Sequence, residues 1–211
     1  MLAHPFTDIV STEEQLREIL GTPSERVIKK CVPSLDKHSK TFIAHSPFVL
    51  LSTANREGRC DVSPRGDEPG FVHVLDDNTL LLPDRPGNKR IDSILNVIDN
   101  PRVGLLFVIP GVEDTLRVNG RAAVVRDPEL LESLAHRGKT PQLAIAIETE
   151  EVFFHCAKAF KRSSLWQPEH WPDASNVPSL AQIIVDQVRD PNLTVEAVAC
   201  DLEEAYRTNL Y

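Results

Sequence analysis

Several features that would assign the protein to a class at once are missing from the sequence. No apolar run approaches the roughly 18 residues of a membrane-spanning helix. The opening MLAHPFTDIV has no charged segment followed by an apolar core, so we expect no signal peptide and no membrane association. A basic excess is also missing, since the formal net charge is −8. A chain so acidic is not expected to bind nucleic acid, because it has no surplus cations to neutralise a phosphate backbone.

Disulfide and metal-binding patterns are missing as well. The sequence has no C-x-x-C pair, and its four cysteines lie far apart, at Cys31, Cys60, Cys156 and Cys200. We expect them to be reduced thiols of a cytoplasmic protein. No H-x-x-x-H motif is present, and the neighbouring His155 and Cys156 point apart on a helix or a strand. The ligand spacing of a metal site is therefore lacking, and none is expected.

The common catalytic and nucleotide-binding loops are absent too. Without a G-x-S-x-G element, isolated serines and cysteines do not make an activated nucleophile, and hydrolytic chemistry has little support. There is also no Gly-rich phosphate loop, and no G-x-G-x-x-G follows an expected strand. A nucleoside triphosphate or a dinucleotide is therefore not the expected ligand.

What remains is an ordinary globular composition. The 211 residues are 41% hydrophobic and 26% charged, enough for one substantial domain. We divide residues 1–211 into a helical lead-in over 1–46, a core over 47–166 and C-terminal helices over 178–211. In the lead-in, a capping box of Ser11 and Glu14 opens a helix that ends at Gly21. Further helices are expected at 24–30, 36–44, 127–136, 155–165, 179–188 and 195–206.

The core reads as strands joined by turns. Strands are expected at 48–54, 59–63, 71–75 paired with 79–82, 103–109, 115–125 and 142–154. The unbroken apolar character of 48–54 and 103–109 indicates burial on both faces. We interpret Asn119-Gly120 as a β-bulge inside one continuous strand rather than a hairpin turn. About six strands with interspersed helices predict an α+β fold that is mainly β, built on a mostly antiparallel closed barrel.

Residues 61–107 carry the first sign of a ligand. A helix is expected to have Ile91, Ile94, Leu95 and Ile98 on one face and to end at Asn100-Pro101. Its first turn would hold Asn88, Lys89 and Arg90, which is the unfavourable end of the helix dipole for cations. Free N–H groups, the dipole and two cations together form an anion site. The alternative is two solvated surface cations, at a cost of about 0.3–1 kcal/mol each.

Arg65 favours the anion site. If the strand edge carrying Ser63 and Arg65 faces the helix start, these residues surround one phosphate together with Asn88 and Arg90. A small phosphorylated cofactor fits this set best. Asp67 and Asp84 lie in the same region, where an acid could orient Arg65 or Arg85, or bind a ligand hydroxyl.

A second cationic group follows the last strand. Lys158 and Arg162 are four residues apart, on one helix face, and Trp166 lies a further turn on. A cationic pair beside an aromatic ring could hold the electron-rich pyrimidine edge of a flavin. The simpler interpretation is a solvated basic helix face.

Four segments in order carry a family resemblance: SPRGDEPGFVHVLDD, LLPDRPGNKRIDSILNVIDNPRVGLLF, TLRVNGRA and FFHCAKAFKRSSLW. Together they resemble the pyridoxamine 5′-phosphate oxidase-like, FMN-binding split-barrel family, closest to its subgroup of FMN-dependent enzymes of unassigned reaction. The resemblance covers roughly residues 25–175. It implies a six-stranded split β-barrel, FMN as the phosphate ligand, and a homodimer with FMN at the subunit interface.

The resemblance also implies roles for single residues. Ser63, Arg65, Asn88 and Arg90 would hold the phosphate and ribityl chain, and Leu82, Pro83 and Asp84 would line the isoalloxazine ring. Lys158, Arg162 or Trp166 would come from the partner subunit. The function implied is an FMN-binding oxidoreductase acting on a small molecule, with no catalytic side chain assigned.

One departure from the family bears on the substrate. Pyridoxamine phosphate oxidases carry a C-terminal Arg-rich segment that grips the substrate phosphate, whereas this chain continues as VEAVACDLEEAYRTNLY. Oxidation of vitamin B6 phosphates is therefore not expected. Two alternatives stay open: a non-enzymatic flavin or haem carrier, with His73 or His155 as axial ligand, and a deazaflavin-using reductase.

Overall fold

A computed structural model describes residues 6–211, so the first five residues of the segment tested for a signal peptide lie outside it. The described residues form two compact units, which divide after Cys31. The first contains α1 (Glu13–Leu20) and α2 (Glu25–Lys29). The capping box of α1 lies one residue later than predicted: Thr12 caps the helix and Gln15 bonds back, because these two side chains have the required spacing. Gly21 ends α1 as expected.

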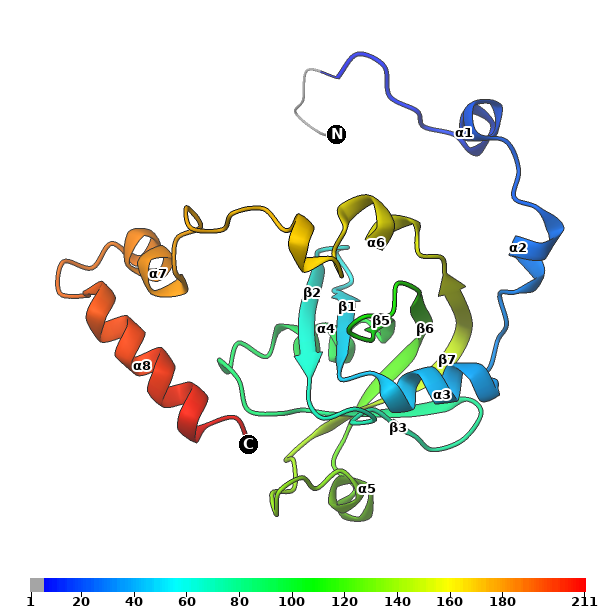
Figure 1. Ribbon diagram of the computed structural model, residues 1–211. Coiled ribbons are helices and arrows are strands. Elements are labelled where there is room, and N and C mark those ends of the chain that lie inside the picture. Colours follow the sequence, from blue (N-terminus) through cyan, green and yellow to red (C-terminus); the bar gives the residue numbers. More distant parts are fainter. Residues whose placement is uncertain (1–5) are drawn as a thin grey trace. The chain divides into compact units, whose positions relative to one another are not determined.

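The second unit contains every strand that the structure describes (Figure 1). The strands are β1 (Phe48–Ala54), β2 (Cys60–Gly66), β3 (His73–Val74), β4 (Thr79–Pro83), β5 (Arg102–Val108), β6 (Thr115–Val125) and β7 (Ala144–His155). The helices are α3 (Lys37–His45), α4 (Asp92–Asp99), α5 (Pro128–Ser133), α6 (Lys158–Ser163), α7 (Leu180–Val188) and α8 (Val195–Thr208), with a 3₁₀ turn at Pro168–His170.

These strands form one antiparallel sheet in the order β2-β1-β5-β6-β7-β4-β3, rolled into a split barrel. The α+β prediction is confirmed, with seven strands where the family resemblance implies six. The predicted 71–75 strand is reduced to the two-residue β3. β2 is one edge of the sheet, and β4 lies at the other edge beside the short β3. The barrel is therefore open along a seam between β2 and the end of β4, which is where ladder hydrogen bonds are missing from both edges.

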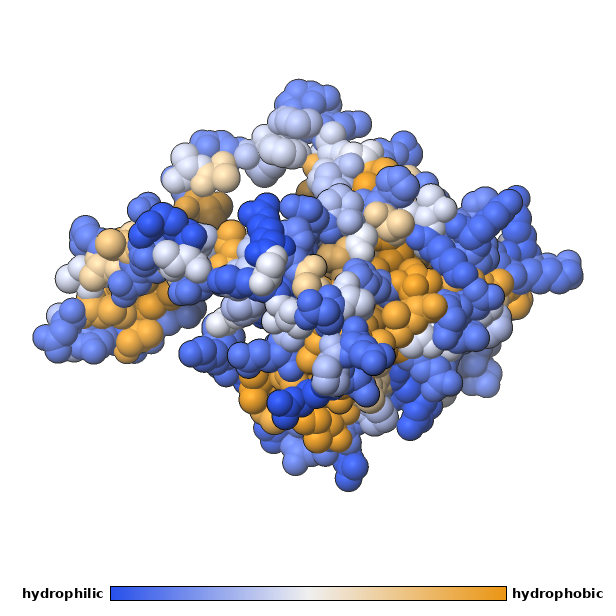
Figure 2. Space-filling model, turned by 90° about the horizontal axis from the view of Figure 1, so that it is seen from below, coloured by the Kyte–Doolittle hydropathy of each residue, from blue (hydrophilic) through white to orange (hydrophobic). Residues whose placement is uncertain are grey.

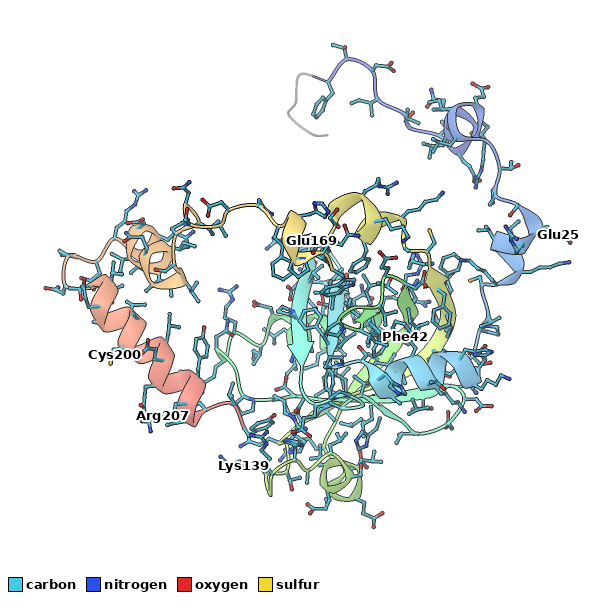
Figure 3. The ribbon with its side chains drawn as sticks, in the orientation of Figure 1. Glu25, Phe42, Lys139, Glu169, Cys200 and Arg207 are labelled. Carbon is cyan, nitrogen blue, oxygen red and sulfur yellow. The ribbon has the colours of Figure 1, made fainter. Side chains whose placement is uncertain are left out.

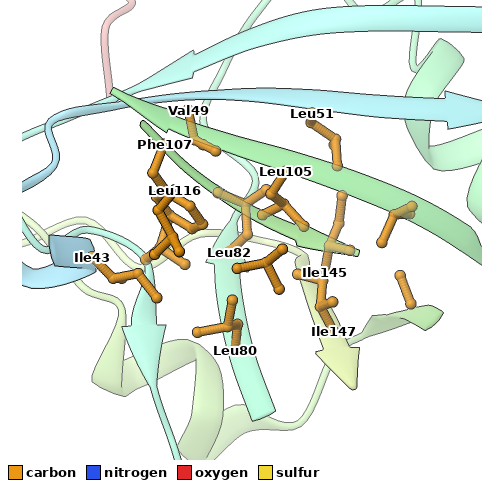
Figure 4. Packing of buried hydrophobic residues seen from close by; sticks show 14 of the residues in the cluster. Ile43, Val49, Leu51, Leu80, Leu82, Leu105, Phe107, Leu116, Ile145 and Ile147 are labelled. Atoms are coloured by element: carbon orange, nitrogen blue, oxygen red, sulfur yellow. The ribbon is translucent and has the colours of Figure 1, made fainter. Parts of the chain in front are cut away.

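The barrel interior is an apolar core. Val49, Leu51, Leu105, Phe107 and Ile147 are each at most 1% exposed and point into it from neighbouring strands (Figure 4). Burial alternates along β1 and β5, so the predicted burial of these strands on both faces is wrong for a single chain. The residues on their outer faces are only partly covered within one chain.

The bulge predicted in β6 is present. The register between β6 and β7 shifts at Asn119 and Gly120, and the strand continues on both sides of the shift. Gly120 is required there, since a Cβ at this position would lie 2.0 Å from the backbone oxygen of Glu148. Asn-Gly therefore bends a barrel strand here rather than closing a hairpin.

α4 packs on one end of the barrel, in contact with β1, β2 and β6. Its C-terminal limit at Asn100 agrees with the prediction, but its buried face does not. Ile94 and Val97 are buried with Ser93, whereas Ile91, Leu95 and Ile98 are 51%, 53% and 69% exposed. The helix also begins later than predicted, at Asp92, so Asn88, Lys89 and Arg90 precede it rather than forming its first turn.

The C-terminal helices extend from the barrel by the linker 167–178. Ser179 caps α7 and Thr194 caps α8, each with a side chain that accepts a hydrogen bond from a backbone N–H of the first turn. α7 and α8 pack against each other, and the pair still presents apolar side chains at its surface (Figure 2). No helix among residues 6–211 is long and apolar enough to cross a membrane.

Candidate functional site: a polar cavity at the barrel seam

A cavity of about 830 Å³ opens at the seam of the barrel. Its walls are contributed by β2, by the segment 83–94 that runs from β4 into α4, and by the loop before β7. Phe71 and Tyr211 complete the lining. The site therefore lies where the sheet is not closed by its own ladder, so side chains rather than backbone groups bridge the two edges.

Two ion pairs bridge this seam, one with its arginine on the β2 side and the other with its aspartate on that side. Arg65 at the end of β2 bonds Asp84 beyond β4, with 2.8 Å between Nη1 and Oδ1. Two residues further, Asp67 accepts a 2.7 Å bond from Nε of Arg85. Both acids singled out in the sequence are thus paired with arginines in the described chain. Neither pair is freely solvated, and the Asp67 side chain is only 1% exposed, so breaking one partner would leave a buried charge.

The ion pair between Arg65 and Asp84 leaves further N–H groups of Arg65 for a ligand. Its Nε bonds the Ser63 hydroxyl at 3.3 Å and its Nη1 bonds Asp84, while a guanidinium has five N–H groups. Ser63 in turn shares a 3.0 Å hydrogen bond with Ser93 in the first turn of α4. This contact joins β2 to the helix start, which brings the two predicted halves of the phosphate site together.

The segment that precedes α4 is strained. Lys89 and Ile91 have φ of 62° and 53°, values that side chains other than glycine adopt rarely and a β-branched residue hardly at all. Arg90 lies between them, with its N–H on Asn88 at 3.0 Å and its Nε on Asp92 at 2.8 Å. Strained backbone of this kind is concentrated at ligand sites, where the surrounding structure holds it in place.

The start of α4 offers free donors toward the cavity. The first N–H groups of a helix have no partner within the helix, and the N-cap residue Ile91 makes no side-chain capping bond. The cavity lining also carries five cations against three carboxylates, although the whole chain carries a net charge of −8. The cations are Arg65, Arg85, Lys89, Arg90 and Lys139, and the carboxylates are Asp61, Asp84 and Asp92. The site is thus suited to an anion.

The structure brings most of the predicted site residues together. Those that line the cavity are Ser63, Arg65, Pro83, Asp84, Asn88 and Arg90. Leu82 does not line it: this side chain is fully buried in the barrel core, because alternation along β4 directs Leu80 and Leu82 inward. In the described chain Leu82 packs in the core, and its place beside the cofactor ring stays a prediction.

The second cationic group lies elsewhere in the chain. Lys158 and Arg162 are on α6, and Trp166 follows it, with its indole N–H on the backbone oxygen of Val112 at 2.9 Å and its ring stacked on Phe160. None of the three is part of the cavity lining formed within the described chain. Their contribution from a partner subunit stays a prediction.

Tyr211 is a cavity residue that the sequence did not single out. Its hydroxyl donates to Asp67 at 2.8 Å, and this bond raises the pKa of Tyr211. Burial alone would raise the pKa of Asp67, but bonds from the Glu68 N–H, from Tyr211 and from Arg85 outweigh burial and lower it. No local sequence pattern predicts a contact between residues 144 positions apart. The position of Tyr211 depends on how α7 and α8 fold.

The histidines named as possible haem ligands do not meet the cavity. His73 lies half-buried on β3, where burial and the charge of Arg85 lower its pKa. Neither it nor His155 is in the cavity lining of the described chain. Residues 6–211 contain no group of three or more metal-binding side chains.

Comparison with known proteins adds the family. A sequence model described as "Pyridoxamine 5′-phosphate oxidase" matches residues 35–156, which is more than half of the chain. No curated protein matches.

Solved structures of several proteins resemble the chain at low identity. HupZ of Group A Streptococcus is 17% identical, with a TM-score of 0.48, over 57% of this chain and 93% of that one. A candidate pyridoxamine 5′-phosphate oxidase from Lactobacillus delbrueckii is 20% identical, with a TM-score of 0.46, over 58% and 99%. An FMN-binding protein from Syntrophomonas wolfei is 13% identical, with a TM-score of 0.46, over 68% and 93%. On the extent of the sequence match alone, this chain belongs to the pyridoxamine 5′-phosphate oxidase family.

Proposed function

We propose that the seam cavity binds FMN and that the protein is a homodimeric FMN-dependent oxidoreductase acting on a small molecule. The observation that carries the proposal is the meeting of Arg65, Arg90 and the uncapped start of α4 around one cavity. A phosphate dianion is matched by paired guanidinium donors and by helix N–H groups. Support also comes from an FMN-binding protein among the similar solved structures.

The residues present fit the cofactor by their chemistry. Ser63, Arg65, Asn88 and Arg90 would hold the phosphate and the ribityl chain, and Pro83 with Asp84 would border the ring. The cavity of about 830 Å³ is within the range of cofactor sites. Bound FMN would supply the electron transfer, while the protein fixes its position and electrostatics. Asp84 holds Arg65 by a 2.8 Å ion pair, so the arginine is oriented before the ligand arrives.

The homodimer is part of the proposal, and the outer faces of the barrel support it. Leu50 stands opposite Leu106 across β1 and β5, and both are only partly covered in one chain. The exposed stripe Leu95 and Ile98 on α4 adds apolar surface. A second copy would cover these residues and could bring Lys158, Arg162 or Trp166 to the ring. Light scattering should give twice the 23.5 kDa chain mass; a monomer mass with flavin bound would contradict the dimer.

A cytoplasmic location is likewise proposed, in keeping with free thiols at Cys60, Cys156 and Cys200.

The first test is an absorption spectrum of the purified protein, with the ligand released by heat identified by mass. A flavin spectrum and the mass of FMN are expected. A Soret band would point instead to haem, and preference for a deazaflavin in titration would favour the reductase alternative that an F420 reductase among the similar structures suggests. Protein that stays colourless and takes up no added FMN would overturn the proposal. Reduction of bound FMN by a small-molecule donor, monitored as the loss of flavin absorbance, then separates an enzyme from a carrier.

A further inference from the structure

Tyr211 reaches the cavity from the opposite end of the sequence. It follows α8 through Asn209 and Leu210, and it belongs to the cavity lining together with residues of β2 and of the segment 83–94. Figure 3 shows Cys200 and Arg207 along α8 and Lys139 close to the end that follows this helix. The helical pair α7–α8 thus leads a single aromatic side chain to the seam of the barrel.

The contacts that hold Tyr211 are specific and come from three segments. Its hydroxyl donates to the buried carboxylate of Asp67 at 2.8 Å. Its ring lies 5.8 Å from the guanidinium carbon of Arg85 and 5.3 Å from that of Arg137. The main-chain oxygen accepts a 2.7 Å bond from Nζ of Lys139, and the ring of His136 stacks at a tilt with its centroid 4.8 Å away. These contacts fix the position of Tyr211, whereas Tyr206, on α8 itself, is 57% exposed.

The anchor of Tyr211 is tied to the proposed phosphate site. Asp67 stands two residues after Arg65, roughly 7 Å along an extended chain. Each of the two residues is paired across the seam, Arg65 with Asp84 and Asp67 with Arg85. A ligand with its phosphate at Arg65 and a planar ring extending to the Asp67 side of the cavity would meet Tyr211.

We propose that Tyr211 is a cofactor-contacting residue: its ring forms a wall against the flavin ring, and Asp67 positions it through the hydroxyl. This inference rests on the proposed FMN site. It gives the C-terminal helices a role, which is to position Tyr211 at the cavity. The chemistry suits it, because a phenol is an aromatic surface with one polar handle, and aromatic pairs gain from stacking beyond simple burial.

The test compares three full-length variants, Tyr211→Ala, Tyr211→Phe and the control Tyr206→Ala, with the wild type. FMN affinity is measured by titration, and the fluorescence of bound FMN is measured at saturation. An electron-rich phenol in contact with a flavin quenches its fluorescence by electron transfer, whereas a phenyl ring or a methyl group does not. The fluorescence of bound FMN therefore reports contact with the phenol. If Tyr211 had only a structural role, its substitution would not change this fluorescence.

Tyr211→Ala is expected to weaken FMN binding roughly three- to tenfold and to raise the flavin fluorescence. Tyr211→Phe should keep most of the affinity, because it keeps the ring, and should still raise the fluorescence. Tyr206→Ala should match the wild type in both. If the wild type binds FMN but both Tyr211 variants behave like Tyr206→Ala, this inference is overturned and the proposed function stands. If the wild type binds no FMN, both are overturned.

Discussion

The wall of the barrel and its seam are built by different kinds of interaction. In the wall, β5, β6 and β7 form antiparallel ladders, interrupted by the bulge at Gly120, and enclose apolar side chains that are almost wholly buried. At the seam, β2 and the end of β4 share no ladder, and the edges are joined by charged side chains and a strained loop. The wall is held by its strand ladders and by apolar burial, whereas the seam keeps polar groups near a cavity. Stability and ligand binding should therefore respond separately to changes in the two regions.

The largest effect is expected in the barrel core, for Leu82→Ala. Leu82 is fully buried in the core, so its truncation leaves a cavity and should lower the free energy of unfolding by about 3 kcal/mol. Urea unfolding measures this. Leu75→Ala is the control, since Leu75 lies in the same hairpin and is 45% exposed; its cost should be under about 1 kcal/mol. FMN affinity of the folded Leu82→Ala protein should be unchanged, and a selective loss of affinity would restore Leu82 to the cofactor site.

Gly120→Ala should rank next. The added Cβ would meet the backbone oxygen of Glu148 at 2.0 Å, so β6 and β7 must separate locally. We expect a loss of about 2.5 kcal/mol in unfolding free energy, toward the upper end of overpacking costs. Gly87→Ala is the matched control in the seam, where a Cβ meets nothing within 4 Å. Equal stability of the two variants would mean that the bulge is not held by close strand contact.

At the seam, Arg65→Ala and Arg90→Ala should act on binding. Each removes a charge-assisted donor from the proposed phosphate site and should weaken FMN binding by about 2 kcal/mol, measured by titration of the apoprotein. The control is Arg102→Ala, because Arg102 pairs with Glu150 on the wall and does not line the cavity. Unchanged affinity in both seam variants would remove the phosphate assignment while leaving the fold intact.

The same division explains what could be predicted from the sequence. The strand predicted at 48–54 and the helix predicted at 36–44 lie close to the observed β1 and α3, because apolar runs and capping residues act within a few positions. The bulge at Gly120 was predicted for the same reason. Local pattern could not say which face of β1 or α4 is covered, since that depends on what packs against it. Ile98 fits the periodic stripe and is nevertheless 69% exposed.

At the seam, the residue types were predictable and their pairing was not. The positions of Ser63, Arg65 and Arg90 in the sequence suggest an anion site. The ion pairs of Arg65 with Asp84 and of Arg85 with Asp67 depend instead on which strand edges meet in the fold. The strain at Ile91 also follows from how the chain must enter α4 from the cavity. Tyr211 depends on two further helices, so no local rule could place it.

The smallest expected effect is a change in the pH dependence of stability for Asp67→Asn. The pKa of Asp67 is lowered in the folded protein, so its carboxylate contributes stability above the unfolded value of about 3.9, and this contribution is lost as the pH falls through the lower folded value. Asparagine does not titrate, so the difference in unfolding free energy between wild type and Asp67→Asn should shrink as the pH is taken from 6 to 3. Tyr211→Phe removes one of the hydrogen bonds that lower this pKa and should give an intermediate slope. Parallel stability curves for wild type and Asp67→Asn in urea unfolding across this range would show that the Asp67–Arg85 pair carries no such contribution, and the seam would then be held by its other contacts.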